Sequence, residues 1–129
     1  MVSIDTNVLV RLVTHDDEAQ FVRAERLIKN GVVFIPETVL LETEWVLRHA
    51  YKLDRVQIHN LFTCVLGLGN TKVDRPLVVH DALSWFSDGM DFADALHLAG
   101  CSHCDTLATF DRAFIKSAKG CSPCTVSLP

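Results

Sequence analysis

Short apolar runs alternate along the chain with segments whose apolar residues recur at helical spacing. Strands are predicted at residues 2–4, 32–35, 106–110 and 125–128, with a weaker strand around Val73. The run at 32–35 lacks polar alternation, which is typical of a strand that is covered on both faces. Helices are predicted at about residues 9–13, 17–28, 38–51, 55–66, 76–86, 91–100 and 113–119.

Residues suited to helix ends stand at the boundaries of these segments. Asp16 or Asp17, and later Asp54, can cap helices, while Pro76 suits a first helical turn and Gly31 a helix C-terminus. Strands that alternate with helices predict an α/β fold with a mostly parallel sheet covered on both sides. Ligands of such sheets bind beyond the carboxyl ends of the strands, so candidate chemistry lies in the residues after each strand.

The length of 129 residues predicts a single domain over 1–129, because two halves would each approach the lower limit of a self-supporting core. Apolar residues make up 49% of the chain and charged residues 22%, which excludes a mainly disordered protein. The formal net charge of −4 argues against coating nucleic acid by bulk charge. A nuclease stays possible, because a metal ion can supply the missing positive charge.

The apolar start of the chain does not resemble a targeting segment. Residues 1–13 are interrupted by Asp5 and Arg11, and they lack a basic start and a small-residue cleavage site. No run approaches the roughly 18–20 apolar residues that span a bilayer. We therefore expect a cytoplasmic protein with no membrane contact, and the odd number of cysteines also fits poorly with a secreted disulfide framework.

Carboxylates gather at the predicted active edge of the sheet, just past the strands. They are Asp5, Glu42, Glu44, Asp91, Asp94 and Asp111. Asp91 and Asp94 are three residues apart and share a helix face, whereas helical spacing does not separate Glu42 from Glu44. One of these two glutamates is expected to be an ion-paired or solvated charge. Because clustered carboxylates repel one another, they favour a cation among them, and hard oxygen ligands favour Mg²⁺ or Mn²⁺.

Several of these carboxylates also have a purely structural interpretation. Asp5 suits a turn, and Asp111 suits the cap of the helix that follows it. Asp91 suits a helix cap with Asp94 at the third position, although a cap can also be a metal ligand. Asp94 is harder to explain in this way, because its neighbours in the sequence are small and apolar.

Four segments in order along the chain carry a resemblance to a known family. They read Ile4-Asp5-Thr6-Asn7-Val8-Leu9-Val10-Arg11, Leu41-Glu42 leading into Trp45-Val46-Leu47-Arg48, Asp91-Phe92-Ala93-Asp94-Ala95-Leu96, and Thr109-Phe110-Asp111. Together they resemble the PIN domain, and more closely the VapC-type toxins of toxin–antitoxin pairs. The resemblance implies a PIN-like three-layer α/β fold, with a four- or five-stranded parallel sheet between helices. It implies a Mg²⁺- or Mn²⁺-dependent endoribonuclease that cleaves RNA, a homodimer, and a VapB-type antitoxin whose C-terminal part lies over the active site.

The resemblance also implies residue roles. The four acidic positions of the family, which are catalytic and bind metal, match Asp5, Glu42, Asp94 and Asp111. Glu42 is thereby selected over Glu44. An accessory acid matches Asp91, and polar residues that shape the site match Thr6, Asn7 and Thr109. In the implied mechanism, an activated water attacks the scissile phosphate in line while one or two ions neutralise the developing charge. Candidates for holding the RNA backbone, with ordinary solvated surface as the alternative, are Arg11, Arg48, Arg112 and Lys116.

Four of the five cysteines form a C-x₂-C-x₁₆-C-x₂-C pattern that consists of Cys101, Cys104, Cys121 and Cys124. The spacing falls within the range of structural Zn²⁺ sites, and the predicted topology places it at the sheet end opposite the carboxylates. Free thiols in a reducing compartment are the other interpretation. Cys64 lies among apolar residues and is expected in the core.

Two other classes of protein compete with the nuclease. A Mg²⁺-binding signalling module of the receiver type shares the alternating pattern, but it requires an acidic pair after the first strand and a lysine after the last. Here Asp5 stands alone, and the last strand ends in Ser127-Leu128-Pro129. A non-catalytic RNA-binding module is the second alternative, and incubation of RNA with Mg²⁺ or with EDTA separates it from a nuclease.

Overall fold

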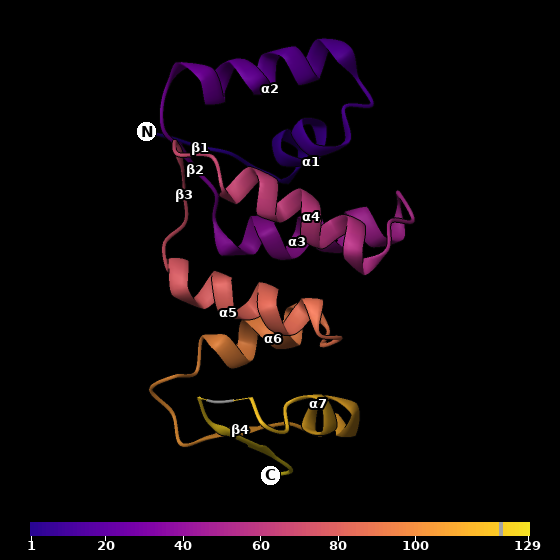
Figure 1. Ribbon diagram of the computed structural model, residues 1–129, viewed down its shortest axis with the longest axis vertical. Coiled ribbons are helices and arrows are strands. Elements are labelled where there is room, and N and C mark those ends of the chain that lie inside the picture. The colour runs from indigo at the N-terminus through magenta and orange to yellow at the C-terminus, as the bar shows by residue number, and fades with distance from the viewer. Residues whose placement is uncertain (122) are drawn as a thin grey trace. The chain divides into compact units, whose positions relative to one another are not determined.

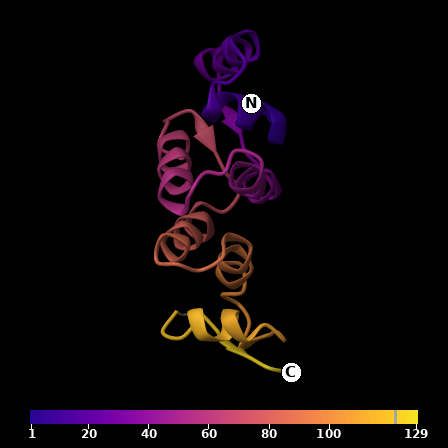
Figure 2. The same cartoon turned by 90° about the vertical axis from the view of Figure 1, so that its right-hand side faces the viewer.

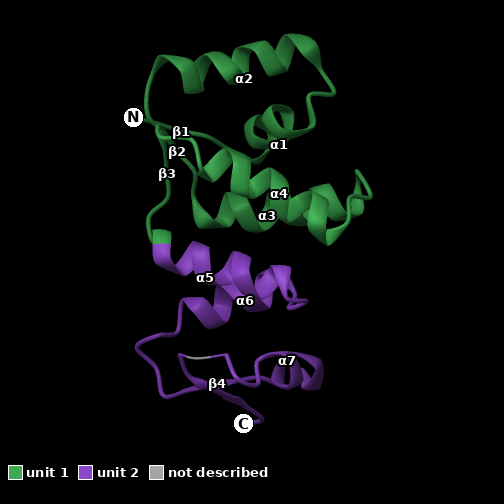
Figure 3. Ribbon diagram, in the orientation of Figure 1, with its two compact units in different colours: residues 1–76 green, residues 77–129 purple. Residues whose placement is uncertain are grey.

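The structure is a computed structural model that describes residues 1–121 and 123–129. The chain divides into two compact units, residues 1–76 and 77–129 (Figure 3). The first unit contains β1 (Val2–Ser3), α1 (Thr6–Thr14), α2 (Glu18–Asn30), β2 (Val33–Phe34), α3 (Glu37–His49), α4 (Arg55–Leu66) and β3 (Thr71–Lys72). From the boundary onward follow α5 (Pro76–Ser87), α6 (Phe92–Ala99), β4 (Thr106–Ala108), α7 (Arg112–Ser117) and β5 (Thr125–Ser127).

All strand pairs in the described residues are parallel, as the alternating pattern predicts. In the first unit the order is β1-β2-β3, with Val2 opposite Val33 and Val33 opposite Thr71. Val33 and Ile35, which share one face of the strand, are fully buried, but Val32 is exposed and Phe34 is only half-buried, so the prediction that this run is covered on both faces is wrong. In the second unit β4 pairs with β5, with Thr106 opposite Thr125. The expected parallel strands are thus present, in hydrogen-bonded groups of three and two among the described residues.

The helix starts follow from side-chain capping. Asp17 rather than Asp16 caps α2, because its carboxylate accepts a 3.0 Å hydrogen bond from the Gln20 amide. Asp54 forms a full capping box with Gln57, which fixes the start of α4 at the predicted residue. The predicted strand around Val73 lies slightly earlier, at β3, where the Thr71 hydroxyl donates a 2.8 Å hydrogen bond to the Val65 carbonyl.

Helix packing builds each unit around buried apolar side chains. In the first unit α1 packs against both α2 and α3, and α3 packs against α4 (Figure 1). Its most deeply buried large residues are Leu9, Leu40, Leu47, Ile58 and Phe62. In the second unit α5 and α6 lie side by side in both views (Figures 1 and 2), where Phe86 and Phe92 meet edge to face with ring centroids 5.4 Å apart.

One core assignment from the sequence is wrong. Cys64 is exposed, because α4 turns Phe62 and Val65 inward and leaves the intervening thiol outside. Among the helices of the described residues, none combines the length and apolar character needed to cross a membrane.

Candidate active site

In the first unit, Asp5 lies between the end of β1 and the start of α1. Its carboxylate Oδ1 accepts a 3.0 Å hydrogen bond from the Val8 amide and so caps the helix. Asp5 therefore has a structural role as a helix cap, where the sequence suggested a turn residue, and its Oδ2 has no hydrogen bond to any described residue. Of the two polar neighbours in the sequence, Thr6 is buried and Asn7 is exposed. Asp5 is thus an exposed, oriented carboxylate just past a strand, which is compatible with a ligand role.

The two glutamates of α3 have opposite environments. Glu44 is only 2% exposed, and both of its carboxylate oxygens accept 3.0 Å hydrogen bonds from the Arg48 guanidinium. Glu42 is exposed. The expectation that one glutamate is ion-paired is therefore confirmed, and that residue is Glu44. Glu42 retains a carboxylate that solvent and ligands can reach, on a helix that packs against α1.

In the second unit, Asp91 and Asp111 cap two helices. Asp91 accepts a 3.2 Å hydrogen bond from the Asp94 amide at the start of α6, as the capping interpretation predicts. One oxygen of Asp111 accepts hydrogen bonds from the first amides of α7, at 2.9 and 3.1 Å. The hydroxyl oxygen of Thr109 accepts a 3.0 Å hydrogen bond from the Asp111 amide. Thr109 therefore fixes the backbone that carries Asp111.

Asp94 interacts electrostatically with both of these carboxylates. Burial raises the pKa of Asp94, and the negative charges of Asp91 and Asp111 raise it further, while His97 lowers it. Burial and like charge both disfavour the ionised form, and a bound cation relieves both effects. Asp94, at the start of α6, therefore lies within electrostatic range of both Asp91 and Asp111, the latter of which follows β4.

The chemistry of these donors fits a hard divalent cation, since all are carboxylates and two are already oriented by helix caps. Among the described residues, however, no three His, Cys, Asp or Glu side chains are gathered into a set that could hold a metal ion. The zinc interpretation of the four cysteines is therefore unsupported. All four are free thiols, although Cys104, Cys121 and Cys124 line one open hollow of about 590 Å³. Burial raises the pKa of Cys121, as does the charge of Asp88.

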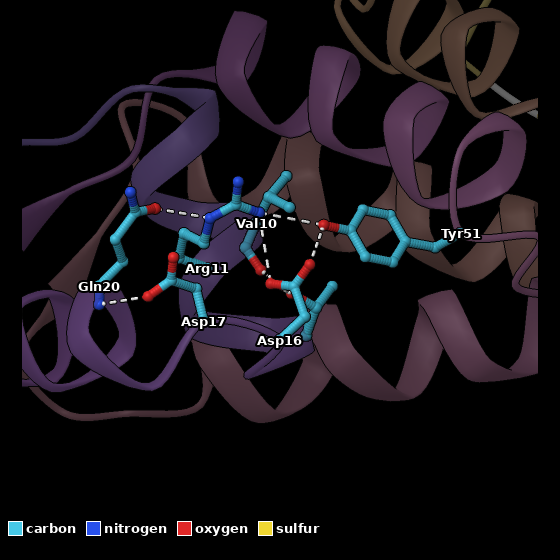
Figure 4. A network of polar contacts seen from close by, with 7 residues as sticks. Val10, Arg11, Asp16, Asp17, Gln20 and Tyr51 are labelled. Carbon is cyan, nitrogen blue, oxygen red and sulfur yellow. Dashed lines mark hydrogen bonds and ion pairs between the residues drawn. The ribbon is translucent and has the colours of Figure 1, made fainter.

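Two of the candidate RNA-binding cations are held by internal partners. Arg11 donates to the Gln20 side-chain oxygen at 2.6 Å, to Asp16 at 3.3 Å and to the Tyr51 hydroxyl at 3.0 Å (Figure 4). Arg48 is paired with Glu44, as described above. The sequence did not indicate the partners of Arg11, because they lie outside α1, whereas the Glu44–Arg48 pair has the i,i+4 spacing that could have predicted it. Arg112 and Lys116, by contrast, are exposed on α7.

Two further features escaped the sequence pattern. A hollow of about 320 Å³ between α1 and α2 is lined by Asn7, Arg11, Arg23 and Leu27, among others. Phe110 was assigned to a strand, but β4 ends at Ala108 and the Phe110 side chain is 84% exposed. An aromatic residue between two polar ones at a predicted strand end is the signal that could have indicated this exposure.

The sequence profile of the PIN domain matches residues 2–120, a span that includes every acidic residue discussed above. The chain therefore belongs to the PIN domain family, whose members are generally nucleases that act on RNA and typically use divalent metal ions. No curated protein and no solved structure showed significant similarity to the chain.

Proposed function

We propose that this PIN domain is a Mg²⁺- or Mn²⁺-dependent endoribonuclease, with Asp5, Glu42, Asp94 and Asp111 as its catalytic metal ligands. The observation that carries the proposal is the electrostatic coupling of Asp94 with Asp91 and Asp111, in a chain whose family match covers all of these residues. The span of that match also supports the expectation that residues 1–129 form a single domain.

In this proposal the main contribution of the protein is to hold the metal-binding carboxylates in fixed orientations. Asp5 and Asp111 each have one oxygen held by helix amides, so little side-chain entropy is lost when the other oxygen binds a cation. Thr109 supports Asp111, and Asp91 adds negative charge beside Asp94. A divalent ion, when bound, would lower the pKa of the attacking water and would neutralise negative charge on the phosphoryl oxygens. Glu42 completes the set, either as a direct ligand or through water.

A cleavage assay tests this proposal. Labelled RNA incubated with the full chain should be cut in Mg²⁺ or Mn²⁺ and should stay intact in EDTA. Asp5→Asn and Asp94→Asn should each lower the rate about 100-fold or more, as expected for groups that stabilise charge in the transition state. Asp105→Asn, which alters an exposed carboxylate of the second unit, is the control purified in parallel. Cleavage that persists in EDTA, or equally in all variants, would contradict the proposal.

A double mutant tests whether the acids act as one site. If Asp5 and Asp94 serve the same ion, the double variant should be about as slow as either single variant, because groups that act as a unit are not additive. If the two losses multiply, the residues act independently, and the shared metal site is wrong even though the nuclease activity stands.

We further propose the finer role of a VapC-type toxin in the cytoplasm, paired with a VapB-type antitoxin and acting as a homodimer. The four sequence segments support this assignment. Induced expression should stop growth of a bacterial host, and the Asp94→Asn variant should not. Sedimentation of the purified chain measures its oligomeric state. Growth that is unaffected by the active enzyme would argue for a PIN nuclease with another role.

A further inference from the structure

Phe110 is the most exposed large apolar residue of the described chain, and it directly precedes the candidate catalytic residue Asp111. Its side chain is 84% exposed, whereas Phe114 in the same unit is 4% exposed and packs inward from α7. The second unit therefore has a core that buries one phenylalanine, while Phe110 lies outside that core. A ring left in water beside a proposed catalytic carboxylate suggests a partner that stacks on it.

The backbone on both sides of Phe110 is anchored. The Thr109 amide donates a 3.0 Å hydrogen bond to the Ser127 carbonyl of β5. On the other side, the Asp111 amide is bonded to the Thr109 hydroxyl, and the Asp111 carboxylate caps α7. The ring is thus presented from a fixed position, and a ligand that stacks on it need not order a loop first.

The cations that follow Phe110 and Asp111 along the chain favour a polyanionic partner. Arg112 and Lys116 are one helical turn apart and therefore share a face of α7, and Lys119 follows the helix. All three are exposed, and among the described residues no acidic group forms an ion pair with them. Cations next to an exposed aromatic ring are the combination that holds the backbone and a base of a single nucleic-acid strand.

We infer that Phe110 is a base-stacking residue of the substrate site, where it takes one unpaired base beside the scissile phosphate while Arg112 and Lys116 contact the RNA backbone. The inference rests on the proposed ribonuclease function and deepens it. Because a base within a duplex already has two stacking neighbours, Phe110 favours an unpaired nucleotide next to the cut. It is thus a specificity-determining residue.

The test is equilibrium binding of a short fluorescein-labelled single-stranded RNA, followed by fluorescence anisotropy in EDTA so that metal-dependent cleavage cannot consume the probe. The Phe110→Leu variant keeps apolar bulk but removes the aromatic face, and it should bind about 5- to 150-fold more weakly. Phe110→Trp, which keeps an aromatic face, should bind this RNA with about the affinity of the wild type. Leu77→Ala, which alters an 80% exposed apolar residue of the same unit, is the matched control and should bind like the wild type.

Abasic substitutions at each RNA position in turn locate the stacked base. The wild type should lose affinity strongly at one position, and Phe110→Leu should be insensitive at that position. Arg112→Gln should reduce the slope of log affinity against log salt by about 1. Equal binding by Phe110→Leu and the wild type, or a change confined to oligomeric state, overturns the inference. Failure of the wild type to cleave any RNA in Mg²⁺, with the Phe110 effect on binding intact, instead overturns the proposed function.

Discussion

The carboxylate of Asp111 raises the pKa of Asp94, although a helix end, a loop and a strand separate the two residues along the chain. Burial is the larger cause of this shift, and Asp91 adds to it. The coupling connects the fold of the second unit to its proposed chemistry, because the same repulsion that disfavours ionised Asp94 favours a cation.

The variant Asp94→Asn should lose RNA cleavage but gain stability in the absence of metal. Because the pKa of Asp94 is raised above its ordinary value of 3.8, the folded chain binds more protons than the unfolded chain between the two pKa values, and stability falls as pH rises through this window. Asparagine carries no charge at any of these pH values, so the variant does not lose stability as pH rises through this window. The gain near pH 7 should be below about 1 kcal/mol, because solvent screens the partly exposed side chain.

Urea unfolding in EDTA at several pH values measures this gain. The advantage of Asp94→Asn over the wild type should disappear below about pH 3, where Asp94 is protonated in both states. Added Mg²⁺ should raise the unfolding midpoint of the wild type more than that of the variant, because a ligand stabilises only the state that binds it. A pH-independent difference between the two proteins would show that the charge repulsion is not its cause.

Substitutions of Glu42 and Glu44 should have different effects: that of Glu42 on RNA cleavage, and that of Glu44 on the stability of the fold. Glu42→Gln alters an exposed carboxylate and should lower RNA cleavage about 100-fold while leaving the unfolding midpoint unchanged. Glu44→Gln places an amide nitrogen opposite the Arg48 guanidinium and should cost about 1–2 kcal/mol of stability. Cleavage rates and thermal unfolding of the two variants, measured side by side, check this. If Glu44→Gln is the variant that loses activity without losing stability, the assignment of Glu42 is wrong.

The sequence predicted the elements and the candidate acids better than it predicted their partners. Caps such as Asp54 and Asp111 act on amides two or three residues away, so local sequence specifies them. The choice between Glu42 and Glu44 depended on family resemblance, although the i,i+4 spacing of Glu44 and Arg48 already indicated the ion pair that the fold shows. Spacing alone suggested zinc at the cysteines, but spacing does not fix the directions in which thiols point. The exposure of Phe110 depended on a strand end that apolar patterning does not locate.

Tyr51→Phe should weaken the network that fixes Arg11. The Tyr51 hydroxyl donates a 2.6 Å hydrogen bond to Asp16 and accepts one from Arg11 at 3.0 Å (Figure 4). Its hydrogen bond is the largest cause that lowers the pKa of Asp16, followed by that of Thr14. A lowered pKa contributes stability that is present above the ordinary value of 3.8 and is lost as pH falls through the folded value.

The loss caused by Tyr51→Phe should therefore be greatest near neutral pH and should shrink in acid. Thermal unfolding across pH measures it, with Asp16→Asn and the double variant completing a cycle. The two single losses should not add, because both variants weaken the same charge-assisted hydrogen bond. Strict additivity would show that the pair contributes nothing to the stability of the folded chain.

Thr43→Val should stabilise the protein by about 1 kcal/mol. Thr43 is fully buried in α3, and its hydroxyl Oγ1 has no hydrogen-bond partner among the described residues. Valine has nearly the same shape and the same β-branched preference in a helix, so the substitution removes only the cost of an unsatisfied polar group.

The matched control is Thr63→Val in α4, where the exposed hydroxyl donates a 2.8 Å hydrogen bond to the His59 carbonyl. That substitution should be neutral or slightly destabilising. Urea unfolding of both variants gives the comparison, and RNA cleavage by Thr43→Val should match the wild type because the site beside Glu42 keeps its charge. A loss of stability in Thr43→Val would mean that the buried hydroxyl has a partner in solution, with ordered water as the first candidate because it satisfies buried polar groups.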